Sequence, residues 1–365
     1  MGEGELRPLS LRSFEIKDLG INLRARCLNN KDLSVKYFKF NRIEMQVFHK
    51  LDDIPRDFGP ALVSVGNFDG VHRAHRNVIG EIVWRAQATH VRSVVVTFEP
   101  HPARILRPEQ NLKLLTPLPE KLRLLEATGI DAVVLLPFSR DLSLMTPHQF
   151  AHEILKKRLH AHEVHEGYNF HFGRKAAGNI ELLREFGLEM GFEVHDYSEM
   201  RLRGENVSSS HIRKLLSEGR VSRARHLLAR PFSILSTAGR GRGYGAKYTV
   251  PTINLAHYEE LVPKDGVYIT RTRIGSGTNN DCFDSVTNVG NRPTFGADSF
   301  AIETHLLNFH PIALSAETEV ELHFLDRLRD EIKFPSVEAL KEQIGRDVRK
   351  AQKYLRRLGP SGARS

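Results

Sequence analysis

The sequence predicts an α/β domain with a parallel β-sheet, followed by a small antiparallel β-barrel and a C-terminal helix. Short apolar runs alternate with helical stretches up to about residue 230, and short strands, Gly-rich turns and Pro-containing loops follow. The apolar runs of the first part are continuous stretches of β-branched residues and leucine, which is typical of strands that helices cover on both faces. At 365 residues the chain is too long for one ordinary core.

The first domain is expected over residues 45–230. Residues 1–44 mix charges, asparagines and scattered apolar residues without periodicity, so we expect a poorly ordered extension or a start codon assigned too early. Ligands bind at the carboxyl ends of parallel strands, so the loops after residues 65, 98 and 167 are expected to share one crevice. Strands are expected at 61–66, 91–98, 131–138 and 162–167, and helices at about 76–90, 119–128, 147–160, 209–218 and 220–229.

The second domain is expected over residues 231–358. Pro231 cannot lie inside a helix, and directly after it the helical pattern gives way to short strands and Gly-rich turns. A charged amphipathic helix is expected over about 336–356, and a disordered tail over 359–365. The segments that we expect as antiparallel strands of the barrel are PFSILSTAG, PTINLA, DGVYITRTRI, FDSVTNVG, IETHLLNF and TEVELHFLDRL.

Composition narrows the classes of protein and partner. The chain has 53 Lys and Arg against 44 Asp and Glu, a net charge of +9, which suits an enzyme that attracts polyanionic small molecules. No long run of like charges and no Arg-rich block with aromatics occurs, so we expect no nucleic-acid partner. The two cysteines, in no metal-type spacing, exclude a disulfide framework and a zinc finger. No apolar stretch approaches the roughly 20 residues that span a bilayer, and no secretion signal is present, so we expect a cytoplasmic protein without a membrane partner.

The stretch GNFDGVHRAH at residues 66–75 lies between an apolar strand and a helix. Its glycines permit a tight turn, and the helix that follows offers N–H groups and a partial positive charge to an anion. His72 and His75 are three residues apart, so both imidazoles lie on one face of the first helical turn. A core pair, a metal site and a phosphate site are the alternatives. The order of strand, glycine turn, histidines and helix favours phosphate, and a metal site lacks further ligands at a fixed spacing.

Two further motifs come after strands of the same domain. In VTFEPHP at 96–102, two prolines make a stiff turn around His101, which is either part of a site or a simple turn. In EGYNFHFGRKAAGN at 166–179, Asn169 and Phe170 suit hydrogen bonding and stacking of a base, unless the segment is a Gly-rich surface loop.

A fourth motif, VSSSHIRKLL at 207–216, begins a helix. Ser208 or Ser209 is expected to cap this helix, and Arg213 follows on its first turns. Any helix can begin in this way. A hydroxyl cluster and an arginine at a helix start, in the same domain as His72, are less usual.

The barrel contains candidates for a second nucleotide site. GRGRGYGAKYTVPTINL at 239–255 has glycines and basic residues that suit a phosphate cradle or a solvated loop. Thr252 and Asn254 offer hard oxygen donors two residues apart on one strand face, as Mg²⁺ carried by a nucleotide requires. Glu303, in IETHLLNF, is either an ordinary solvent-facing residue or a base that accepts a proton from a substrate hydroxyl.

In this order the motifs resemble those of a known family. GNFDGVHRAH is similar to the GxFDGxHxGH element of the HIGH-type nucleotidyltransferases, and the later motifs resemble bacterial bifunctional riboflavin kinases/FMN adenylyltransferases, from about residue 45 to 356. The resemblance implies a Rossmann-like adenylyltransferase domain and a riboflavin kinase barrel. It implies phosphorylation of riboflavin to FMN and adenylylation of FMN to FAD with release of pyrophosphate, with ATP and Mg²⁺. One retained activity, or adenylyl transfer to a different phosphorylated acceptor, is the alternative, and a weak homo-oligomer is left open.

The resemblance also implies roles for individual residues. Glu303 is expected to be the kinase base, and His72, His75 and Arg213 are expected to stabilise the adenylyl transfer, with the polyphosphate favouring charged histidines. The adenylyltransferase ligand residues are expected to be Gly66, Asn67, Phe68, Asp69, Gly70, His101, Asn169, Phe170, Ser208 and Ser209. The kinase ligand residues are expected to be Gly241, Gly243, Gly245, Lys247, Thr252, Asn254, Asn288 and Arg292, with Mg²⁺ at Thr252 and Asn254.

The sequence departs from the family pattern at two places. Ala74 replaces the glycine that usually precedes the second histidine, but an alanine on a right-handed helical turn needs no special backbone angle. Before PTIN, residues 245–250 read GAKYTV where the family often has Gly-Arg-Thr-Leu-Gly-Phe. Lys247 supplies the positive charge that Ala246 lacks, and Thr249 stiffens the loop, so a deviation in kinase rate is expected.

Overall fold

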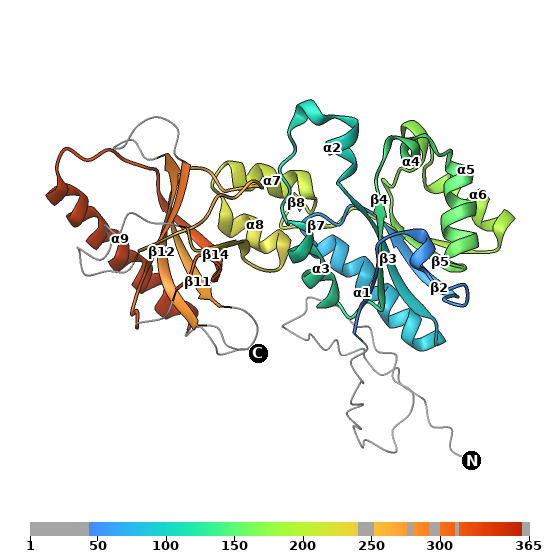
Figure 1. Ribbon diagram of the computed structural model, residues 1–365, viewed down its shortest axis with the longest axis horizontal. Helices are drawn as coiled ribbons and strands as arrows, with labels where there is room; N and C mark the ends of the chain where they lie inside the picture. Colours follow the sequence, from blue (N-terminus) through green and yellow to red (C-terminus); the bar gives the residue numbers. More distant parts are fainter. Residues whose placement is uncertain (1–43, 240–251, 276–280, 292–299, 311–313, 360–365) are drawn as a thin grey trace, which may run out of the picture.

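The structure is a computed structural model that describes residues 44–239, 252–275, 281–291, 300–310 and 314–359. A parallel and an antiparallel sheet lie at opposite ends of this part of the chain (Figure 1). Helices α7 (Ser209–Ser217) and α8 (Val221–Leu228) lie between them. The two predicted architectures, and their order along the chain, are confirmed.

The first sheet has six strands in the order β1-β4-β3-β2-β5-β6, and all neighbours are parallel. From β2 the chain builds β3 and β4 on one side and then β5 and β6 on the other. This reversal places the ends of β2, β3 and β5 side by side, at the edge where ligands bind in such sheets. The strands are β1 (Gln46–Phe48), β2 (Ala61–Val65), β3 (Arg92–Glu99), β4 (Ala132–Pro137), β5 (Ala161–Gly167) and β6 (Glu193–Tyr197).

Helices cover both faces of this sheet, which explains the continuous apolar strands. On one face, Leu62 and Val95 pack against Ile79 of α1. On the other face, Val63 packs in a cluster with Ile154. The helices of this part are α1 (Arg73–Thr89), α2 (Pro102–Leu106), α3 (Leu118–Glu126), α4 (Arg140–Leu144), α5 (Pro147–Phe150) and α6 (Ile180–Met190), with a π-helix at Ala151–Arg158.

Some element boundaries differ from those expected. Helix α1 begins at Arg73 and not near residue 76, because the side chain of His72 caps it. The helix expected over 147–160 is α5 followed directly by the π-helix, and Thr146 forms a capping box at its start. Helix α6 and strand β6 lie in a region for which the sequence led to no assignment.

The second sheet has six antiparallel strands in the order β10-β13-β12-β11-β14-β9. Backbone hydrogen bonds also join its two edge strands: Gly239 N–H donates to Asn254 O (2.8 Å) and Ala256 N–H donates to Thr237 O (2.9 Å). The sheet therefore closes on itself, as a barrel should. The strands are β9 (Phe232–Thr237), β10 (Thr252–Asn254), β11 (Gly266–Ile274), β12 (Asp281–Asn291), β13 (Phe300–Leu306) and β14 (Glu319–Arg329).

Two apolar clusters attach helices to the barrel. Ala351 and Leu355 of α9 (Val337–Leu358) pack on Val267 and Ile269 of β11, which confirms the predicted closing helix. Residues of α7 and α8 share one buried cluster with interior residues of the barrel such as Phe232. The apolar core is therefore continuous across residue 230, where the sequence changes from a helical to a strand pattern. None of the helices described has both the length and the apolar character needed to cross a bilayer.

Candidate active sites

The loop between β2 and α1, residues 66–72, is the central segment of the first candidate site and is named the histidine loop. Gly70 has φ +85°, and a Cβ atom there would lie 2.7 Å from the Leu115 side chain, so only glycine fits. His72 is 4% exposed and caps α1: its Nδ1 accepts the N–H of His75 at 3.4 Å. Because Nδ1 is the acceptor, the neutral ring carries its proton on Nε2.

The predicted pairing of the two histidines on one helical face is confirmed. The imidazole rings of His72 and His75 stack with centroids 3.6 Å apart. Burial lowers the pKa of His72 to about 3, assisted by the Arg230 guanidinium, and burial also lowers the pKa of His75 well below its usual value. Both rings are therefore neutral in the protein without nucleotide. The buried Nδ1 of His75 makes no hydrogen bond within the described part of the chain.

Asp69 joins the loop to two other segments. Its carboxylate accepts the N–H of Leu115 (3.0 Å) and of Thr116 (3.1 Å) and forms an ion pair with Arg213. The Ser209 hydroxyl donates to the Asp69 carbonyl (2.8 Å). Arg213 therefore lies beside the histidine loop, although about 140 residues separate them in the sequence. Protein donors hold both Asp69 carboxylate oxygens, so this residue positions Arg213 and the loop.

Ser208 and His101 both serve as helix caps. Ser208, and not Ser209, caps α7 by accepting the His211 N–H at 3.3 Å. His101 Nδ1 accepts the Ala103 N–H at 3.1 Å, which begins α2. Burial lowers the pKa of His101 to about 4. Both caps are contacts within one helical turn. Capping occupies only Nδ1 of His101, so Nε2 is the atom that could contact a ligand.

Asn169 and Phe170 lie in the turn after β5, at the same sheet edge as the histidine loop. Asn169 is exposed, and the Phe170 ring stacks on Phe172 with centroids 5.2 Å apart. No hydrogen bond in the described residues joins either of them to residues 66–72. The structure therefore brings both residues to the same edge of the sheet as the histidines.

Lys121 of α3 is a candidate that the sequence motifs missed. It is 5% exposed, and among the described residues its ammonium group donates long hydrogen bonds to two neutral groups, the Thr97 hydroxyl (3.3 Å) and the Asn67 carbonyl (3.5 Å), with the carboxylates of Glu99 and Asp69 nearby. Burial lowers its pKa. Lys121 lies one turn before the fully buried Leu125, on the apolar side of α3, and that position was the available signal.

The surroundings of the histidines are rich in cations. Arg230 donates to the Gly70 carbonyl (2.8 Å), and burial lowers its pKa to about 10. The charge of Lys121 lowers the pKa of His75, and the charge of Arg213 lowers the pKa of His101. Both cations therefore lie close to the histidines of this site. Three cations, a helix N-terminus and an Nε2–H donor around one loop suit a polyphosphate ligand.

Ala74 lies within α1, in right-handed helical backbone, and its methyl group packs against the cluster formed with α7 and α8. The side chain therefore contacts protein at a position where the family pattern has glycine. We expect Ala74→Gly to lower the free energy of unfolding by about 1 kcal/mol, because glycine is less favourable than alanine in a helix. FAD formation should stay within twofold of wild type. Urea unfolding and flavin chromatography check this, and a tenfold gain in FAD formation would show that the methyl group crowds the ligand.

The barrel brings four predicted kinase residues together. Asn254 of β10 pairs directly with Glu303 of β13, and Glu303 pairs with Asn288 of β12. Directly paired residues of antiparallel strands point to the same face, so these three side chains form one row. Thr252 lies two residues along β10 on this face, opposite His305. Glu303 faces outward because its neighbour Thr304 is buried inside the barrel.

Two residues at this row were missed by the sequence motifs. Burial lowers the pKa of His305. Glu331 follows β14, and its carboxylate accepts a hydrogen bond from the Asn288 amide (3.2 Å). A Cβ atom at Gly290 would lie 2.4 Å from this carboxylate, so that glycine makes room for it. Gly241, Gly243, Gly245, Lys247 and Arg292, together with the departures at residues 245–250, lie outside the described residues.

Comparisons with known proteins connect the two sites to two activities. The FAD synthetase family model matches residues 54–211, and the riboflavin kinase family model matches residues 228–355. A bifunctional riboflavin kinase/FMN adenylyltransferase from Haemophilus influenzae is 31% identical over 311 residues, which cover 85% of this chain and 99% of that protein. The chain belongs to this family. The bifunctional riboflavin kinase/FMN adenylyltransferase of Escherichia coli strain K12 is 30% identical over 307 residues, covering 84% of this chain and 96% of the relative.

Membership of the riboflavin kinase/FMN adenylyltransferase family confirms the resemblance drawn from the motifs. The chain has both a FAD synthetase domain and a riboflavin kinase domain, and it is an enzyme of the transferase class. A crystal structure described as a macrolide-efflux protein from Streptococcus pneumoniae has the same fold, with TM-score 0.75 and 25% identity. It covers 85% of this chain, and 99% of that chain is matched.

Proposed function

We propose that the chain makes FAD from riboflavin in two ATP-dependent steps. The first step takes place at the kinase row, formed by Asn254, Glu303 and Asn288, and the second at the histidine loop. The boundary between the two domains lies near residue 230. The observation that carries the proposal is the joining of the histidine loop to Arg213 through Asp69. This contact assembles, from distant segments, the donors that an adenylyl transfer requires. The family supplies the substrates riboflavin, FMN and ATP, and a cytoplasmic location without a nucleic-acid partner is part of the proposal.

In the first domain, an oxygen of the FMN phosphate attacks the α-phosphorus of ATP. The new O–P bond forms as the bond between the α-phosphorus and its bridging oxygen breaks, and pyrophosphate leaves. No protein nucleophile is needed, because the FMN phosphate is already ionised. Catalysis is therefore positioning and charge stabilisation, for which the His72 Nε2–H, His75, Arg213 and the N-terminus of α1 are suited.

The other predicted residues of this domain receive supporting roles. The backbone from Gly66 to Gly70 gives the phosphates close access to the start of α1. Asp69 and Ser209 position α7, and Ser208 caps it. Asn169 and Phe170 bind the base, and His101 contacts a ligand through the ring nitrogen that does not cap α2.

In the barrel, Glu303 accepts the proton of the terminal ribityl hydroxyl of riboflavin. The hydroxyl oxygen forms a bond to the γ-phosphorus of ATP, the bond to the β-phosphate oxygen breaks, and FMN and ADP result. Thr252 and Asn254 present oxygen donors on one strand face beside Glu303, and this donor set fits Mg²⁺. When bound with ATP, Mg²⁺ neutralises charge on the phosphates. Asn288 is held by Glu331 and orients groups at the other side of Glu303.

Lys121 belongs to the adenylyl-transfer site in this proposal, because its ammonium group has no charged hydrogen-bond partner among the described residues and lies near the histidines. Lys121→Met keeps the length of the side chain and removes the charge. We expect FAD formation to fall about 100-fold and FMN formation to stay unchanged. Burial disfavours the ammonium group, whereas the nearby carboxylates of Glu99 and Asp69 favour it, so the melting temperature should change little. The matched control is the exposed Lys156→Met, and unchanged FAD formation in Lys121→Met would remove Lys121 from the site.

The proposal is tested by incubating the purified protein with riboflavin, ATP and Mg²⁺ and separating the flavins by chromatography. FMN and FAD together are expected. FMN alone would mean that the first site is inactive or uses a different phosphorylated acceptor, and absence of both would contradict the proposal. Supplying FMN directly separates failure of the first step from failure of the second.

A further inference from the structure

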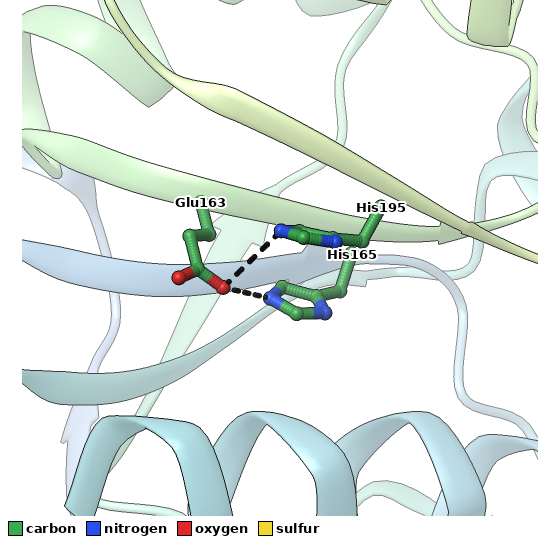
Figure 2. A group of neighbouring side chains, drawn as sticks. All are labelled: Glu163, His165 and His195. Atoms are coloured by element: carbon green, nitrogen blue, oxygen red, sulfur yellow. Dashed lines mark hydrogen bonds and ion pairs between the residues drawn. The ribbon is translucent and has the colours of Figure 1, made fainter. Parts of the chain in front are cut away.

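Two histidines and a glutamate that neither candidate active site uses meet on the α1 face of the first sheet (Figure 2). Glu163 and His165 come from β5, and His195 comes from the neighbouring strand β6. Their ligating atoms all lie within 4.8 Å of one another. Glu163 and His165 are buried, whereas about a third of the His195 side chain is exposed, so the cluster opens to solvent past His195.

One carboxylate oxygen is shared by the two imidazoles. Glu163 Oε2 lies 2.9 Å from His165 Nε2 and 3.5 Å from His195 Nε2 (Figure 2). The Nε2 atom of His195 is buried, and it makes no hydrogen bond within the described residues. A buried imidazole nitrogen without a hydrogen bond is unfavourable, and an ion between the three atoms would satisfy it.

Groups around the cluster fix the orientation of its members. The Tyr197 hydroxyl lies 2.8 Å from His165 Nδ1 and can donate to this nitrogen or accept from it. His165 can therefore release the proton of Nε2 and carry it on Nδ1, as a metal-binding histidine does. Arg85 of α1 holds Glu163 through two bonds, Nε to Oε2 (2.7 Å) and Nη2 to Oε1 (2.8 Å). This arginine orients the carboxylate, and its charge weakens the attraction of the site for a cation.

We propose that Glu163, His165 and His195 bind a divalent transition-metal ion of the zinc class, separate from the Mg²⁺ used with ATP. Two imidazole nitrogens and one carboxylate oxygen are a donor set for Zn²⁺ and not for Mg²⁺, which prefers oxygen ligands. Three protein ligands leave one position for water or for the nearby Glu193, whose carboxylate lies 3.5 Å from His195 Nε2. The ion would join β5 to β6 and, through Arg85, to α1.

The proposal is tested by titrating the full chain with Zn²⁺ in excess Mg²⁺ and measuring heat, and by the visible absorption of bound Co²⁺. One equivalent of each ion should bind to the wild type. His195→Ala should weaken binding at least 100-fold, and Tyr197→Phe about tenfold. Arg85→Gln should bind as tightly as the wild type or more tightly. Circular dichroism and FAD formation from added FMN check that the first domain of each variant is folded.

The matched control is His148→Ala. His148 and His152 are exposed and stacked one turn apart, with Glu189 3.2 Å from His148, so they are the obvious surface alternative for a zinc ion. This variant should bind Zn²⁺ like the wild type. If His148→Ala loses the ion and His195→Ala keeps it, or if the wild type binds no Zn²⁺ in excess Mg²⁺, the proposal is wrong.

Discussion

Replacing His72 or His75 with alanine is expected to lower the rate of FAD formation from FMN about 100- to 1000-fold. The reason is that a preorganised donor aimed at developing charge contributes about two to three powers of ten to the rate. The rate of FMN formation from riboflavin should stay unchanged. The His72 ring is buried and stacks on the partly buried His75 ring beside the cations of the loop, while the kinase row lies on the other sheet. Flavin chromatography with riboflavin or FMN as the substrate measures both activities.

His72→Asn separates the chemical role of His72 from its structural one. Alanine removes the cap of α1 as well as the donor, and loss of a cap costs about 1 kcal/mol. Asparagine is a good N-cap, so His72→Asn should melt like the wild type and yet lose FAD formation as His72→Ala does. Recovery of FAD formation in His72→Asn would mean that His72 only caps the helix. Equal loss of FMN formation in the alanine variants would contradict the assignment of two sites.

Glu303→Gln is expected to lower FMN formation from riboflavin about 100- to 10,000-fold, because a general base typically contributes that factor. Glutamine keeps the size of the side chain in the row between Asn254 and Asn288 but cannot accept the hydroxyl proton. FAD formation from added FMN should stay unchanged. The matched control is Glu319→Gln, an exposed strand glutamate of the same barrel. Kinase activity within tenfold of wild type in Glu303→Gln would mean that Glu303 is not the base.

The fold could be predicted from the sequence because its main signals are local. Buried strands such as β2 are continuous apolar runs, and Pro231 marks the change to the antiparallel strands that follow. The start of α1 was placed too late, because the capping residue is a histidine, and histidine is not among the usual N-caps.

The candidate sites could be predicted in part. Motifs located His72, His75, Arg213 and Glu303, because glycine turns and helix starts are visible in one dimension. The motifs did not reveal that Asp69 is saturated by protein donors, since Leu115, Thr116 and Arg213 reach it only in the folded chain.

Lys121 and the Glu163 cluster were missed for the same physical reason. A lysine in an amphipathic helix is normally exposed, and only packing shows that this ammonium group is buried. The cluster depends on the parallel pairing of β5 with β6, which aligns His165 with His195 across 30 residues of sequence. Spacing along the chain does not predict such a pairing.

The central claim is that two separate sites carry out the two steps, and mixing two variants tests it most directly. His72→Asn alone should convert riboflavin to FMN only, and Glu303→Gln alone should leave riboflavin unchanged. An equimolar mixture of both, with riboflavin, ATP and Mg²⁺, is expected to form FAD after a lag in which FMN accumulates. A mixture that stops at FMN, while Glu303→Gln still makes FAD from added FMN, would show that the His72→Asn chain does not release the FMN that it makes. A mixture that stops at FMN, together with a Glu303→Gln variant that cannot adenylylate added FMN, would contradict the two-site account.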